Sequence, residues 1–117
     1  MEFEYNIAEE KGAQIISLSG NLMDKNQSNQ LMEEIEALIL NGSKHFVINL
    51  GNFQYMNSSG LNVLIHILTK ARKNDGEAII CCMSEKMKQL LVITKLISVF
   101  TIAENTEAAL KHFSVNS

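Results

Sequence analysis

Two adjacent serines, Ser58 and Ser59, stand where a predicted helix begins, directly after a predicted buried strand and loop. The amide N–H groups at a helix start have no partners within the helix and carry a partial positive charge, so an anion is stabilised there. A serine at this point can therefore carry a phosphate, whose added charge of about −1.5 to −2 would change the surrounding surface. The same Asn-Ser-Ser-Gly segment is also typical of ordinary helix capping, which is the alternative without chemistry.

The histidines offer no second reactive centre. His45 is predicted at the start of a strand, His66 on the solvent-facing side of a helix, and His112 in the last helix. None of them is expected beside the serines as a general base, and three isolated histidines do not make a metal site. The chain also lacks the glycine motifs of nucleotide-binding loops and the nucleophile elbow of hydrolases. We therefore expect a protein that is not an enzyme and holds no cofactor or metal.

The two cysteines, Cys81 and Cys82, are adjacent in the sequence and lack the C-x-x-C spacing of redox and zinc motifs. Neighbouring residues in a strand point to opposite faces, so these thiols are not expected to bond to each other. We interpret both as small buried side chains rather than a redox pair.

Apolar periodicity predicts the elements that position the serines. Alternating or continuous apolar runs indicate strands, and apolar residues repeating every three to four positions indicate helices. The predicted strands are 3–7, 13–19, 46–50, 78–82 and 98–102, and the predicted helices are 31–39, 58–73, 85–94 and 106–113. Gly20 is predicted to end the second strand, and residues 51–57 are predicted to form a loop.

The order β-β-α-β-α-β-α-β-α favours an α/β fold, in which parallel crossovers build a mixed five-stranded sheet with four helices and the first strand at an edge. Ligands of such sheets bind beyond the carboxyl ends of the parallel strands. Met23, Met56 and Met83 each follow a predicted strand at that end, so we expect them to surround the Ser58 turn. Methionines there suit a partner surface or simply close the core, and both possibilities stay open.

Composition excludes several classes of protein. The chain has 117 residues, 46% of them hydrophobic and 20% charged, which predicts one globular domain over residues 1–117. Its net charge is −3, so the chain lacks the excess of basic residues typical of a nucleic-acid binder or of a protein held on anionic lipid. No apolar run is long enough to cross a membrane, and the first residues are acidic where an export signal would be basic. We expect a cytoplasmic protein without membrane insertion.

The stretch Phe53-x-Tyr55-Met56-Asn57-Ser58-Ser59-Gly60-Leu61 resembles the Asp-Ser-Ser-Gly-Leu signature of STAS domains, in particular those of bacterial anti-sigma-factor antagonists. Similar stretches extend along the chain, namely Ile16-x-Leu18-x-Gly20-x-Leu22, Val47-Ile48-Asn49-Leu50, Gly76-Glu77 and Cys81-Cys82-Met83-Ser84. The resemblance implies a single STAS-like domain over residues 1–117, with the element order given above.

The resemblance also implies a mechanism. In that family a serine is phosphorylated by a partner anti-sigma factor that is itself an ATP-dependent kinase, and the position here is Ser58. The unphosphorylated protein binds the anti-sigma factor and frees a sigma factor, whereas phosphorylation breaks the complex. ATP is bound by the partner, so this chain is a substrate and binder. The partner-binding residues implied are Met23, Asp24, Met56, Asn57, Ser58, Ser59, Gly60 and Met83.

Two positions depart from the family pattern. Asn57 replaces the acidic residue before the phosphorylated serine; asparagine still caps a helix but carries no charge. Met23 stands where the family often has an aspartate, and Asp24 follows it. The first departure makes a second function credible: a STAS adaptor that is not phosphorylated and docks on another assembly, such as a lipid-transport ATPase.

Overall fold

Over the residues that the structure describes, the sheet has five strands in the order β1-β2-β3-β4-β5. The computed structural model describes residues 3–22, 24–56 and 58–115, without the side chains of residues 25, 54–56, 58, 59, 114 and 115. β1 (Glu4–Glu10) runs antiparallel to β2 (Ala13–Leu22), and the other pairs are parallel: β2 with β3 (His45–Met56), β3 with β4 (Glu77–Cys81) and β4 with β5 (Thr101–Ala103). The expected mixed sheet, with the first strand at an edge, is confirmed.

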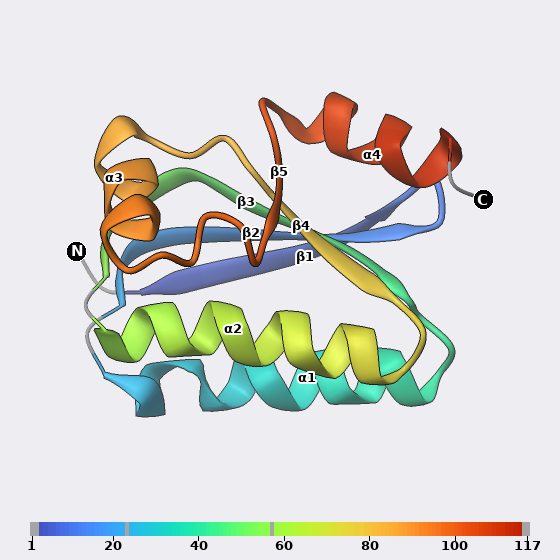
Figure 1. Cartoon of the computed structure of the whole chain (residues 1–117). Helices are drawn as coiled ribbons and strands as arrows, with labels where there is room; N and C mark the ends of the chain where they lie inside the picture. Colours follow the sequence, from blue (N-terminus) through green and yellow to red (C-terminus); the bar gives the residue numbers. More distant parts are fainter. Residues whose placement is uncertain (1–2, 23, 57, 116–117) are drawn as a thin grey trace.

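Helices cover both faces of the sheet (Figure 1). α1 (Asn29–Leu40) and α2 (Ser58–Lys73) lie side by side on one face, while α4 (Thr106–Val115) lies on the other. α3 (Glu85–Ile93) lies at one end of the sheet, and the short 3₁₀ helix η1 (Lys25–Ser28) precedes α1. The predicted element order and the bounds of the second helix are confirmed.

Two layers of core follow from strand alternation, because successive side chains of a strand point to opposite faces. The row Ile16, Ile48 and Ile80, which are register partners across β2, β3 and β4, belongs to the cluster buried under α1, α2 and α3. The row one residue earlier faces α4 and consists of Ile15, Val47 and Ile79, packed with Ala109, Leu110 and Phe113. The parallel strands are therefore apolar on both sides, as continuous apolar runs predict.

The prediction that the second strand ends at Gly20 is wrong, and so is the predicted loop over residues 51–56, while its last residue, Asn57, lies outside the described residues. β2 continues to Leu22 and β3 to Met56, and their extensions pair with each other. The register shifts twice, between Ser17 and Ser19 and again after Gly20, so β3 contains an extra residue at each shift. Such bulges keep two strands paired while bending them, and Gly20 with φ +80° supplies a backbone that other residues rarely adopt.

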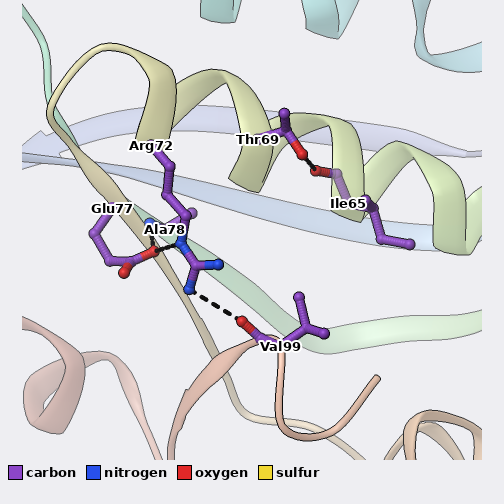
Figure 2. A network of polar contacts seen from close by, with 6 residues as sticks. All are labelled: Ile65, Thr69, Arg72, Glu77, Ala78 and Val99. Carbon is purple, nitrogen blue, oxygen red and sulfur yellow. Dashed lines mark hydrogen bonds and ion pairs between the residues drawn. The ribbon is translucent and has the colours of Figure 1, made fainter. Parts of the chain in front are cut away.

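The last strand is also shorter than predicted. β5 contains residues 101–103, whereas the segment before it forms turns. Figure 2 shows what holds this segment: Arg72 at the end of α2 donates from Nη2 to the carbonyl of Val99 at 3.0 Å and from Nε to Glu77 at 3.1 Å. Glu77 also accepts the N–H of Ala78 at 3.0 Å, so one network ties α2, β4 and the turn before β5 together.

Candidate functional site

The serine motif predicts a functional site at the start of a helix, and that helix is α2. β3 ends at Met56 and α2 begins at Ser58, so one residue separates strand from helix, and that residue, Asn57, lies outside the described residues. The first turn of α2 carries no acidic residue, whereas its last turn carries Lys70, Arg72 and Lys73. The charge distribution leaves the positive end of the helix dipole unopposed by any side chain of the first turn.

Buried residues fix the chain on either side of the two serines. Phe53 and Leu61 are each 5% exposed and belong to the main core cluster, and Gly60 is buried as well. The ring of Phe53 also meets that of Phe3 edge-on at 6.3 Å. The backbone of the strand-to-helix turn is thus anchored at both ends, which is what a preorganised recognition site needs.

The end of β2 lies beside this turn. Leu22 is the register partner of Met56, so the carboxyl ends of β2 and β3 lie next to each other. Asp24 accepts the N–H of Asn26 at 2.9 Å, and the side chain of Gln27 accepts the N–H of Asp24 at 3.0 Å. The Asp-x-x-Gln spacing is typical of such a capping box.

Asp24 is exposed, and the helix that it caps, η1, contacts both α1 and α2. We call Asp24, η1 and the first turn of α2 the helix-start surface. The carboxylate of Asp24 has a structural role in this surface, because it caps the N-terminus of η1.

The expected ring of methionines is only partly described. Met23 and the side chain of Met56 lie outside the described part of the chain. Met83 is half-buried and lines a groove of about 270 Å³ with Ile102, Ala103 and Glu104. Its strand, β4, ends opposite Asn49, well before the end of β3. Met83 therefore lies beside the end of β5, whereas β2 and β3 continue together toward the helix-start surface.

The prediction that Cys81 and Cys82 point apart is wrong. Strand β4 ends at Cys81, and Cys82 takes a left-handed backbone with φ +62°, so strand alternation does not apply to it. Their Sγ atoms lie 3.6 Å apart, and the thiols are free. Cys81 is buried as expected, and Cys82 is half-buried. Burial, followed by the hydrogen bond from the neighbouring thiol, raises the pKa of Cys81 to about 12.

We expect iodoacetamide to label Cys82 and leave Cys81 unmodified in the folded protein. The thiolate is the reactive form, and a buried thiol with a pKa of about 12 stays protonated at working pH. Peptide mapping by mass spectrometry after labelling at pH about 8 checks this. The Cys82→Ser variant serves as the control and takes up label only after denaturation in urea. Labelling of Cys81 in the native wild-type chain would contradict the assignment.

Two of the three histidines contact the same aromatic ring of α4, and the third lies on α2. His45 stacks on Phe113 of α4 with ring centroids 4.3 Å apart, His66 is exposed on α2, and His112 meets Phe113 edge-on. Over residues 3–22, 24–56 and 58–115, no group of three or more histidine, cysteine, aspartate or glutamate side chains is placed to hold a metal ion. Within the same residues, no helix is long and apolar enough to cross a membrane.

Residues 4–109 match the STAS domain family. Because this match covers most of the chain and the fold agrees with it, the protein belongs to the STAS family. The chain is 28% identical over 117 residues to the anti-sigma F factor antagonist of Paenibacillus polymyxa, with all of both chains covered. It is 31% identical over 78 residues to the anti-sigma-B factor antagonist of Staphylococcus aureus, which covers 67% of this chain and 72% of that protein.

A solved structure with the same fold is that of the anti-sigma factor antagonist SpoIIAA in its unphosphorylated form, with a TM-score of 0.79 and 18% identity over 96% of this chain and 97% of that one. The phosphorylated form of the same Bacillus protein superposes with a TM-score of 0.73 and 19% identity, covering 94% of this chain and 99% of that one. At this identity the likeness establishes the fold.

Proposed function

We propose that this protein is an anti-sigma-factor antagonist: it binds an anti-sigma factor with serine kinase activity and is released when that partner phosphorylates Ser58. The STAS match and the relatives named as anti-sigma factor antagonists support the class. The partner binds ATP and carries out the chemistry, so this chain is a regulatory binder and not an enzyme. Its place of action would be the cytoplasm.

The observation that carries the proposal is the start of α2 at Ser58, one residue after β3, in a first turn without acidic side chains. A phosphate there meets the positive dipole end of a helix of 16 residues. The modified chain would therefore stay folded while its surface gains about two negative charges. That combination is what a reversible switch at a binding surface requires.

The proposed binding surface extends over the helix-start surface and its neighbours. Leu22 and Met56 pair where β2 and β3 end, which supports a continuous patch from Asp24 to the serines. We propose that the partner contacts Met23, Asp24, Met56, Asn57, Ser58, Ser59, Gly60 and Met83. Of these, Met83 is expected to lie toward the margin of the contact, because it lines the groove beside β5.

The alternative function, an adaptor that is never phosphorylated, is favoured by Asn57. A carboxylate beside the nucleophilic hydroxyl can accept its hydrogen bond and orient it, and an amide does this less strongly. If the protein is such an adaptor, the serines only cap α2, and the surface around them docks on another assembly, such as a transport ATPase.

We expect Ser58 to be phosphorylated about fivefold more slowly in the wild-type chain than in an Asn57→Asp variant. The added carboxylate repels the incoming phosphate, but water and salt screen repulsion at an exposed turn. Orientation of the hydroxyl then dominates, because positioning controls phosphoryl transfer. Its gain of about 1 kcal/mol corresponds to about a fivefold rate.

The experiment incubates the anti-sigma factor recovered from the source cell with ATP and the wild-type, Asn57→Asp or Ser58→Ala chain. Intact mass and peptide mapping then give the rate and site of phosphate incorporation. Label in the first two chains and none in Ser58→Ala supports the proposal. Label on Ser59 would overturn the site, and no label on any chain would favour the adaptor.

A further inference from the structure

The edge strand β1 borders a groove next to the helix-start surface, with which it shares Gln27 of η1. β1 is the first strand of the sheet and, within residues 3–22, 24–56 and 58–115, pairs with β2 alone. The groove has a volume of about 610 Å³ and is lined by Phe3, Glu4, Tyr5, Asn6, Ile7, Gln27, Gln30 and Glu34. Phe3 and the first four residues of β1 all line this groove, which therefore runs along the edge of the strand, since successive side chains of a strand point to opposite faces.

The groove has the form of a site for an extended chain. One wall is the outer edge of β1, whose backbone groups are available for pairing as at any sheet edge. The other wall is a stripe of polar side chains, Gln27, Gln30 and Glu34, presented by η1 and α1. Tyr5 and Ile7 are half-buried and pack against the core, which gives the groove an apolar floor.

The charge of the groove is negative. Among the lining residues that the structure describes, Glu4 and Glu34 are acidic and none is a lysine, arginine or histidine. The hydroxyl of Tyr5 donates to the carboxylate of Glu34. Burial above all, then this hydrogen bond and the charges of Glu34 and Glu33, raise the pKa of Tyr5 to about 12, so the hydroxyl stays protonated and can donate to Glu34.

A second copy of this chain fits the edge poorly. In a two-fold antiparallel pairing of β1 with itself centred on Ile7, Glu4 of each copy would stand opposite Glu10 of the other. Like charges directly opposite each other destabilise a strand pair. A partner strand with basic side chains would instead be attracted, because Glu4 and Glu34, the charged residues described in the lining, are both acidic.

We propose that the groove between β1 and α1 binds an extended basic peptide segment of a partner protein, which adds to the sheet as a strand beside β1. Main-chain hydrogen bonds to the edge would supply affinity, and alternate side chains of the peptide would meet Glu4 and Glu34 on either side. The groove adjoins the helix-start surface at Gln27 of η1, so one partner could occupy both.

The test uses a fluorescein-labelled synthetic peptide of alternating lysine and valine, seven residues long, and fluorescence anisotropy at physiological salt. We expect saturable binding by the wild-type chain and at least a tenfold loss of affinity in Glu34→Lys. The matched control is Glu107→Lys, which makes the same charge change at an exposed position on α4, across the sheet. The control should bind as the wild type does.

Hydrogen exchange locates the peptide and separates strand addition from charge attraction alone. Bound peptide should slow exchange of amides within residues 4–7, and a peptide with a central proline should bind weakly because proline cannot complete the ladder. Equal loss in Glu34→Lys and Glu107→Lys, unchanged exchange in β1, or no binding would each overturn the proposal. A dimer that dissociates in Glu34→Lys would overturn it in favour of self-association.

Discussion

A Ser58→Asp chain is expected to bind its anti-sigma factor more than a hundredfold more weakly than the wild type, with an unchanged fold. At the start of α2 the added carboxylate meets the positive end of the helix dipole, which stabilises it by about 0.3–1 kcal/mol in the free protein. In the complex, the same charge loses its water. An unpaired charge at an interface costs several kcal/mol, and about 3 kcal/mol already exceeds a hundredfold in affinity.

Calorimetric titration of the purified partner measures this loss, and circular dichroism with thermal unfolding checks the fold. Ser58→Ala, which adds no charge, should bind close to wild type. The control for a remote charge is Ser43→Asp, in the connection between α1 and β3, near the opposite end of the sheet. Unchanged affinity of Ser58→Asp would mean that the start of α2 is not the contact.

Gly76→Ala is expected to lower the free energy of unfolding by about 3 kcal/mol or more, through overpacking against backbone. A Cβ at Gly76 would lie 2.1 Å from the carbonyl oxygen of Lys44 and 2.8 Å from its carbon. Neither side can move freely: the Lys44 carbonyl accepts the N–H of Glu77 at 2.9 Å, and Gly76 donates to Ala71 at 2.8 Å. This close approach joins the end of α2 to the start of β3 and β4.

Thermal and urea unfolding test the prediction, with a melting temperature more than about 10 °C below the wild type expected for a domain of this size. Gly12→Ala is the matched control. It also places a methyl group on a turn glycine, at φ +82° with no atom within 4 Å of the new Cβ, so only backbone strain of about 1–2 kcal/mol is added. Equal melting temperatures of the two variants would contradict the proposed clash.

The helices could be predicted from the sequence because the residues that mark a helix lie close together in the chain. The apolar spacing of α2 and the serines at its start predict the helix with its observed bounds of Ser58 and Lys73. Ser84 caps α3 by accepting the N–H of Met87 at 3.2 Å, and Asn105 caps α4 by accepting that of Ala108 at 2.8 Å. These contacts join residues three apart, so residue type and spacing suffice to predict them.

The extensions of β2 and β3 could not be predicted in the same way. Gly51 and Asn52 are residue types typical of turns, yet they lie at a bulge whose geometry is set by pairing with β2, more than thirty residues away. The position of Met83 could not be predicted for the same reason. β3 continues well past the end of β4, so Met83, which follows β4, lies away from the end of β3. Cys82 was misassigned because the strand ends one residue earlier than its apolar pattern suggests.

The most direct test of the central claim, that phosphorylation of Ser58 releases a bound anti-sigma factor, is to follow the complex before and after addition of Mg-ATP. Size-exclusion chromatography with light scattering reports the complex, and mass spectrometry reports the phosphate. The account predicts that the wild-type complex dissociates while one phosphate appears on Ser58, and that the Ser58→Ala complex stays intact. A wild-type complex that persists in Mg-ATP without gaining phosphate would contradict it.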